Sequence, residues 1–208
     1  MSRLAAISAS VAVVALIGVT AYMTLGDSSD DPFEQCRTGA VAGGGATIGG
    51  PFTLVNAKGD TVTDTDVITE PSLVYFGYTF CPDVCPFDTA RNSEAVDLLA
   101  ERGISATPIF ISIDPERDTP EAVGDFAFNN HEKMIGLTGT PEQVKAASKA
   151  YRTYYKAQPA EDEYYLVDHS TFTYLVLPEV GFVEFFRRET TPEQMADQVA
   201  CFAQAAAK

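Results

Sequence analysis

Two cysteines, Cys81 and Cys85, offer the clearest chemistry in this 208-residue sequence. Three residues separate them, whereas a thioredoxin-type redox site has two residues between its cysteines. The wider spacing still permits a disulfide, and it also lets two thiolates diverge around a metal ion. Thiolates are soft ligands that select Cu(I), zinc or iron–sulfur centres. Structural zinc sites and clusters usually need four protein ligands, whereas one further ligand would complete a trigonal copper site.

The segments on either side of the cysteines predict where the two sulfurs lie. Residues 72–77 (SLVYFG) are a short apolar run that suits a buried strand. Residues 86–102 read as a helix, closed by Gly103 in a left-handed conformation. Pro86 is tolerated in the first helical turn because N–H groups there have no helical partner. A helix N-terminus stabilises thiolates, so we expect both sulfurs at an exposed end of this helix.

The remaining elements predict an α/β fold. Residues 51–55 and 106–113 read as strands, and residues 171–177 and 181–186 as a strand pair. Three helices are expected to begin with threonine as the N-cap and proline at the first position, at Thr119, Thr140 and Thr191. The last two have glutamine at the third position, which completes a capping box. This order predicts a thioredoxin-like fold, with a central mixed sheet flanked by helices.

That fold points to His169 as the third ligand. His169 lies just before the expected strand 171–177, at a junction that faces the cysteine loop in thioredoxin-like proteins. Redox members of the fold usually have a cis-proline there, but the nearest upstream proline in this chain is Pro159. Histidine at this junction favours metal binding over thiol exchange. Asp168 is a candidate to orient or polarise the site.

The N-terminal segment predicts a membrane anchor. Residues 4–25 contain no charged residue, and a helix of that length reaches about 33 Å, enough to cross a bilayer core of roughly 30 Å. Arg3 precedes this run and acidic residues follow it, which places the N-terminus in the cytoplasm and the rest outside. A cleaved signal peptide is the alternative, but its apolar region is normally shorter.

We therefore expect three parts in the chain. Residues 1–25 would form the anchor, residues 26–47 an acidic and then Gly/Ala-rich tether, and residues 48–208 the folded domain. The expected location is the bacterial inner membrane, with a single N-terminal span and the C-terminal domain in the periplasm, where disulfides form. The formal net charge of −15 argues against nucleic-acid binding and suits the steering of cationic partners.

Three motifs in order resemble the Sco/SenC family of copper chaperones for cytochrome c oxidase assembly. They are residues 75–86 (YFGYTFCPDVCP), 114–120 (DPERDTP) and 167–170 (VDHS). The resemblance covers roughly residues 48–202 and includes the N-terminal anchor. It is specific because all three motifs occur together and in the right order.

The resemblance implies a copper site formed by Cys81, Cys85 and His169. Family members bind copper through these residues and help to load the copper A centre in subunit II of cytochrome c oxidase. We expect Cu(I), bound by the reduced cysteines and a neutral imidazole, with Cu(II) as a second candidate ion. Further expected partners are an upstream periplasmic copper donor or a thiol reductant.

Other interpretations of these residues remain open. Cys81 and Cys85 could be the attacking and resolving thiols of a thiol–disulfide oxidoreductase, an activity that some family members have, or of a thioredoxin-like peroxidase. They could also form a plain structural disulfide. His131 reads as a surface loop residue. The group Asp114, Arg117 and Asp118 fits either a turn with a helix cap or a role in docking or loop support.

Two further cysteines, Cys36 and Cys201, lie in the expected tether and in the last expected helix. In an oxidising compartment they could pair and join the tether to that helix. In the chain-entropy model a loop of that length stabilises the fold by at most roughly 5 kcal/mol.

Overall fold

The computed structural model describes residues 18–20, 31–37, 48–159 and 164–207. The chain divides into two compact units, Met1–Glu34 and Gln35–Lys208. Most of the expected anchor and tether therefore lies outside the described residues. Among the helices that are described, none combines the length and hydrophobicity needed to cross a bilayer. The elements that carry the candidate site all belong to the second unit.

A mixed sheet of seven strands forms the centre of the second unit, in the order β2-β1-β5-β4-β3-β8-β9. Strands β3, β4 and β5 are parallel to one another, and β8 runs antiparallel to β3. A separate two-stranded sheet pairs β6 with β7. The strands are β1 (Thr53–Asn56), β2 (Thr61–Thr63), β3 (Ser72–Gly77), β4 (Thr107–Ser112), β5 (Ile135–Thr138), β6 (Tyr155–Ala157), β7 (Val167–His169), β8 (Thr173–Leu177) and β9 (Gly181–Phe186).

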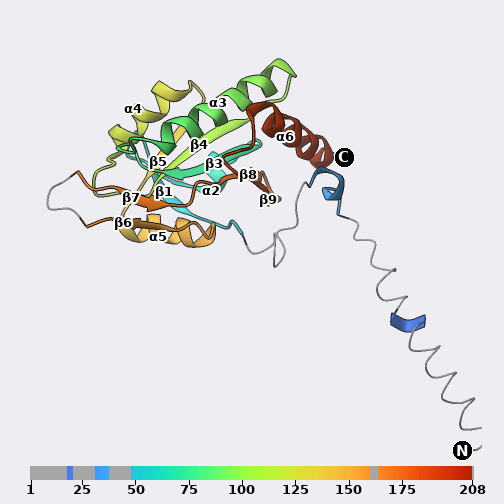
Figure 1. The fold of residues 1–208 in the computed structure, drawn as a ribbon, viewed down its shortest axis with the longest axis horizontal. Helices are drawn as coiled ribbons and strands as arrows, with labels where there is room; N and C mark the ends of the chain where they lie inside the picture. The colour runs from blue at the N-terminus through green and yellow to red at the C-terminus, as the bar shows by residue number, and fades with distance from the viewer. Residues whose placement is uncertain (1–17, 21–30, 38–47, 160–163, 208) are drawn as a thin grey trace, which may run out of the picture. The chain divides into compact units, whose positions relative to one another are not determined.

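Helices cover both faces of the seven-stranded sheet. Figure 1 shows α3, α4 and α6 on one side of the sheet and α5 on the other. The helical elements are η1 (Glu34–Cys36), α2 (Asp64–Val67), α3 (Val84–Glu101), α4 (Pro120–Asn130), α5 (Pro141–Ala150) and α6 (Pro192–Ala206). This arrangement confirms the predicted thioredoxin-like α/β fold with a central mixed sheet.

The topology brings the candidate ligands to one edge of the sheet. Every residue of β3 is buried, and α3 follows β3 after a short loop that contains Cys81. Because β8 is antiparallel to β3, with Thr173 opposite Tyr75, β8 begins beside the end of β3. The segment that precedes β8 therefore enters the sheet at the same edge as the cysteine loop.

The predicted helix starts are confirmed. Each N-cap threonine side chain accepts a backbone N–H bond, at 3.2 Å for Thr119 and 3.3 Å for Thr140 and Thr191. At Thr140 and Thr191 the N-cap backbone N–H in turn donates to the glutamine side-chain oxygen, as a capping box requires. Helix α3 begins at Val84, two residues before the predicted start, and Gly103 has the expected positive φ of 74°.

The short strands β2, β5, β6 and β7 were not predicted from the sequence. Strand β5 contains Gly136, which usually weakens a strand prediction. Here the glycine is required by packing, because a Cβ at this position would lie 2.2 Å from the carbonyl oxygen of Val123 in α4. The close approach of α4 to the sheet therefore explains why β5 contains a glycine, although glycine has a low propensity for strands.

Cys36 and Cys201, both in the second unit, form a disulfide that attaches the chain at Cys36 to α6. Their Cα atoms lie 5.6 Å apart, and both cysteines are partly or fully buried. The neighbouring Arg37 donates a hydrogen bond from Nη1 to the carbonyl of Val183 in β9 at 3.0 Å. Part of the expected tether, at Cys36 and Arg37, is thus held against the last helix and the last strand.

We predict that Cys201→Ser lowers the free energy of unfolding by about 2–5 kcal/mol, because the disulfide closes a loop across 165 residues. Chemical denaturation without added reductant measures this change, in a chain in which Cys81 and Cys85 are both replaced by serine. The double variant Cys36→Ser, Cys201→Ser is the control and should match the single variant. An unfolding midpoint equal to that of the unchanged chain would contradict the prediction.

Candidate metal centre

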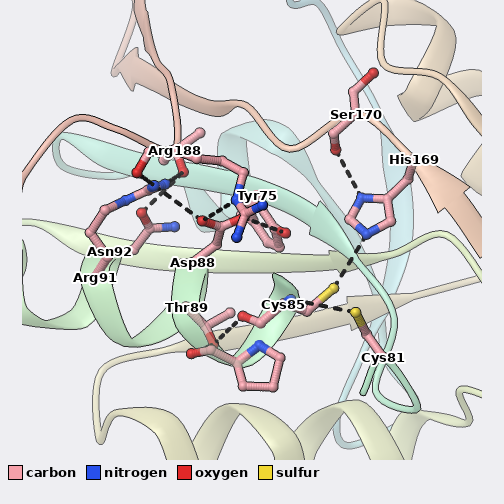
Figure 2. A network of polar contacts seen from close by, with 12 residues as sticks. Tyr75, Cys81, Cys85, Asp88, Thr89, Arg91, Asn92, His169, Ser170 and Arg188 are labelled. Atoms are coloured by element: carbon pink, nitrogen blue, oxygen red, sulfur yellow. Dashed lines mark hydrogen bonds and ion pairs between the residues drawn. The ribbon is translucent and has the colours of Figure 1, made fainter. Parts of the chain in front are cut away.

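The loop before α3, the first turn of α3 and the end of β7 bring three metal-ligating side chains together. One ligand atom from each of Cys81, Cys85 and His169 lies within 4.8 Å of the others. Cys85 Sγ lies 3.4 Å from Nε2 of His169. The Cys85 backbone N–H donates to Cys81 Sγ at 3.4 Å. Figure 2 shows the imidazole and both sulfurs directed toward one point.

Both sulfurs are buried, so the expectation of an exposed helix end is wrong. Cys81 is 8% exposed and Cys85 is fully buried. The rings of Tyr75 and Tyr78 enclose the site and meet the His169 ring edge-on, with centroids 6.2 and 5.8 Å from it. The two cysteines are therefore largely shielded from water, and aromatic rings lie beside the imidazole.

The hydrogen bond at the other ring nitrogen of His169 fixes its tautomer. Nδ1 lies 2.8 Å from the carbonyl oxygen of Ser170. A carbonyl can only accept, so Nδ1 carries the proton and donates it. In the neutral ring Nε2 then has a free lone pair, which faces Cys85 Sγ. This is the state in which histidine binds a metal ion.

Asp168 was expected to orient the imidazole, but the structure gives that role to the Ser170 carbonyl. Successive residues of a strand point to opposite sides, and Asp168 is the exposed neighbour of His169 in β7. Its carboxylate accepts a hydrogen bond from Gln158 Nε2 at 2.8 Å across the hairpin. The Ser170 group that bonds to His169 is a backbone carbonyl, which every residue has. The identity of residue 170 therefore could not predict this contact.

The two thiols have opposite pKa shifts. A hydrogen bond from the Cys85 thiol lowers the pKa of Cys81, and backbone N–H groups add to this against the effect of burial. The same contact with Cys81, together with burial, raises the pKa of Cys85. The pair thus shares one proton, with the negative charge on Cys81. A second thiolate so close by requires a cation to take the place of that proton.

Gly77, the last residue of β3, leaves the space that Cys85 occupies. A Cβ at this position would lie 2.9 Å from Cys85 Sγ, 2.9 Å from Cε1 of Tyr75 and 3.0 Å from Cε2 of Phe110. A real Cβ does not approach other atoms so closely, so the sulfur, both rings or the strand would have to shift. The glycine therefore sets the position of Cys85 Sγ relative to β3.

A buried polar network lies behind Cys85 (Figure 2). The Tyr75 hydroxyl donates to Asp88 at 3.0 Å, and Asp88 pairs with Arg91 at 3.1 Å and Arg188 at 3.6 Å. Burial raises the pKa of Asp88, and the two arginines oppose that effect. Arg91 also donates to Thr173 Oγ1 at 3.2 Å. The helix that carries Cys85 is thus tied to the start of β8, four residues after His169.

The turn after β4 supports the cysteine loop. The Thr79 backbone N–H and hydroxyl donate to the Asp118 carboxylate at 3.0 and 2.6 Å, and Ser112 Oγ donates to it at 2.6 Å. Asp114 bonds to Arg117 Nε at 2.5 Å and accepts from the Tyr165 hydroxyl at 2.6 Å. These contacts favour loop support over a simple turn with a helix cap.

His131, the other histidine of the chain, has a structural role. It ends α4 as the C-cap, its Nδ1 accepts from the Lys133 backbone N–H at 3.0 Å, and its Nε2 lies 3.2 Å from Asp97. The only group of three possible metal ligands that the described residues contain is the one with His169.

The chemistry of the three donors fits a soft ion of low coordination number. Two sulfurs and one imidazole nitrogen are ligands that copper and zinc accept, and zinc normally needs a fourth. With bonds of about 2.0–2.3 Å, three donors around a trigonal ion stand roughly 3.5–4 Å apart. The observed separations reach 4.8 Å at most, so a small contraction suffices.

Comparison with known proteins places the chain in a family. The SCO1/SenC family model matches residues 41–204. The chain belongs to the SCO1/SenC family. Protein SenC of Rhodobacter capsulatus is 56% identical over 201 residues, which cover 97% of this chain and 90% of that protein.

Solved structures of SCO1/SenC proteins share the fold. Copper-bound ScoI of Arabidopsis thaliana is 41% identical, with a TM-score of 0.72 over 76% of this chain and 99% of that one. BsSco, described as a Sco-family cytochrome c oxidase assembly protein with a disulfide switch, is 27% identical. Its TM-score is 0.62, over 78% of this chain and 95% of that one.

We predict that Gly77→Ala lowers the free energy of unfolding by about 1–3 kcal/mol, because the added methyl group overpacks the site. The displaced Cys85 sulfur should also react faster with a thiol-labelling reagent in the native, reduced protein. Mass spectrometry of the labelled peptides measures that rate.

Gly124→Ala in α4 is the matched control. Its Cβ would lie 2.6 Å from the Cβ of Ala57, at a comparable clash among different contacts. It should lose stability without faster labelling of Cys85. Equal labelling rates in the Gly77→Ala and Gly124→Ala proteins would show that Gly77 does not set the position of the sulfur.

Proposed function

We propose that this protein is a copper chaperone of cytochrome c oxidase assembly. It binds copper through Cys81, Cys85 and His169 and delivers it to the copper A centre of subunit II. The observation that carries this proposal is the meeting of two sulfurs with an imidazole whose Nε2 lone pair is left free by the Ser170 carbonyl. The copper-bound structure of a relative with 41% identity supports the choice of ion.

Cu(I) is the proposed cargo. Two thiolates and one imidazole give a soft, three-coordinate set that suits Cu(I), while Cu(II) would need a further oxygen or nitrogen ligand. Neither cysteine is in a disulfide in the structure, and this reduced state is the one that can bind the ion. Binding replaces the proton that Cys81 and Cys85 share, so copper uptake releases a proton.

Delivery by ligand exchange follows from the low coordination number. An incoming thiolate or imidazole of the acceptor can attach to a three-coordinate ion before the donor ligands leave. Large apolar side chains next to the ligands are exposed, with Phe80 at 53%, Phe87 at 70% and Leu166 at 46%. Such residues suit contact with a docking partner. The net charge of −15 favours an acceptor with a basic patch.

The location completes this proposal. An anchor at residues 1–25, a tether at 26–47 and a domain at 48–208 would hold the site on the periplasmic side of a bacterial inner membrane. Confining chaperone and acceptor to one membrane face raises their effective concentration. The Cys36–Cys201 disulfide supports an oxidising compartment for the domain. A copper donor or a thiol reductant in the same compartment would act upstream.

A second candidate function is reduction of the acceptor's disulfide. The opposite pKa shifts of the two cysteines favour it, because Cys81 is the thiolate and Cys85 the thiol. Cys81 would attack one acceptor sulfur to form a mixed disulfide, releasing the other as a thiolate. Cys85, once deprotonated, would then attack Cys81 and leave the acceptor as a dithiol, with Cys81–Cys85 oxidised.

His169→Ala separates the two functions. Loss of a direct ligand should weaken Cu(I) affinity by about 100-fold or more, since loss of a partner outside the ligand set already costs about 10- to 100-fold. Anaerobic titration of the reduced full chain against a competing chelator measures the affinity. Cys81→Ala and Cys85→Ala should weaken binding at least as much.

His131→Ala is the control and should bind Cu(I) as the unchanged chain does. If His169→Ala keeps full Cu(I) affinity and disulfide reduction still requires both cysteines, the chaperone proposal fails and the reductase remains. A His169→Ala protein that loses copper but still reduces a model disulfide would show that the two activities share the sulfurs and differ in the imidazole.

A further inference from the structure

The hairpin that carries His169 is not part of the main sheet. Strands β6 and β7 pair with each other in a sheet of two strands, with Tyr155 opposite His169. A two-stranded ribbon has little stability of its own. The position of the imidazole therefore depends on the short connection to β8 and on side-chain contacts that hold this hairpin against the rest of the domain.

One such set of contacts centres on Arg117, in the turn after β4. Its Cζ lies 3.6 Å from the centroid of the Tyr165 ring, two residues before β7. The Asp114 carboxylate joins the two side chains, since one oxygen bonds to Arg117 Nε and the other accepts from the Tyr165 hydroxyl. Only 12% of the Arg117 side chain is exposed, so its contacts are largely shielded from water.

The same guanidinium also faces the cysteine loop. Its Cζ lies 5.1 Å from the Phe80 ring centroid and 5.7 Å from that of Tyr78. The Tyr78 hydroxyl in turn accepts the backbone N–H of Val167 in β7 at 3.3 Å. Arg117 thus contacts both segments that supply ligands: the loop that leads to Cys81 and the chain that leads to His169.

We infer that Arg117 is a positioning residue for His169, and that its stack on Tyr165 holds the imidazole beside the two sulfurs. The inference rests on the proposed copper site. A planar guanidinium is required, because it stacks on one ring, faces two others and still bonds in its own plane to Asp114. A lysine ammonium keeps the charge but cannot reproduce this stack.

The first experiment uses the copper-free, reduced chain, so that it does not depend on metal binding. NMR nuclear Overhauser contacts between the His169 and Tyr78 rings, whose centroids are 5.8 Å apart, report the position of the imidazole. Arg117→Met should abolish them, and Arg117→Lys should weaken them strongly. Arg102→Met removes a guanidinium that pairs with Asp197 on α6 and is the matched control. If Arg117→Met keeps these contacts at full intensity, the inference is wrong.

The second experiment measures Cu(I) affinity in a double-mutant cycle. Arg117→Met should weaken binding about 10- to 100-fold in the otherwise unchanged chain. It should cause no further loss in the His169→Ala background, because it acts through the imidazole. Equal losses in both backgrounds would overturn the inference, since Arg117 would then act on the cysteines or on the fold.

Two variants of Tyr165 distinguish loss of the stack from a general folding defect. Tyr165→Leu removes the stacked ring and should reproduce the effect of Arg117→Met, whereas Tyr165→Phe keeps the ring and should lose less. Full affinity in Tyr165→Leu would contradict the inference. Unchanged copper binding in His169→Ala would instead refute the proposed site, while the ring contacts in the copper-free protein would still test the position of the imidazole.

Discussion

Strand β8 runs antiparallel to β3, and this pairing determines where the ligands can meet. The segment after β3 and the segment before β8 lie at the same end of these two strands, because Thr173 lies opposite Tyr75. The cysteine loop and the segment around His169 are 84 residues apart in sequence, yet Nε2 and Cys85 Sγ are 3.4 Å apart. The buried strands make this end of the sheet rigid, so the site can be built from loops that a stable scaffold positions.

Burial strengthens the polar contacts of the site. Cys85 is fully enclosed, and charges and dipoles in such surroundings interact more strongly than in water. A carbonyl is enough to fix the tautomer of His169, and one S–H group is enough to separate the pKa values of two thiols. Asp88 and Arg91 are likewise buried, and their contacts tie the first turns of α3 to the start of β8.

The sequence carried more information about local structure than about contacts. Capping threonines and the SLVYFG run predicted three helix starts and the bounds of β3, because their causes lie within a few residues. The hairpin of β6 and β7 was missed, since three-residue strands have no clear periodicity. Asp168 was expected to orient or polarise the site, but it is the exposed neighbour of His169 in β7 and the imidazole bonds to the Ser170 carbonyl instead, an arrangement that could not be read before the strand was known. Arg117 was noted in its motif, but its stack on Tyr165 depends on tertiary packing.

The disulfide between Cys36 and Cys201 and the reduced pair Cys81 and Cys85 require different redox states in one protein. One domain contains a cystine that holds its first and last elements together and, on the proposed function, a dithiol that has to stay reduced to accept copper. Surroundings that oxidise the first pair tend to oxidise the second. On the proposed function, the dithiol would therefore need a source of electrons in the same compartment, and Cys81, at 8% exposed, is the sulfur that such a reductant would reach first.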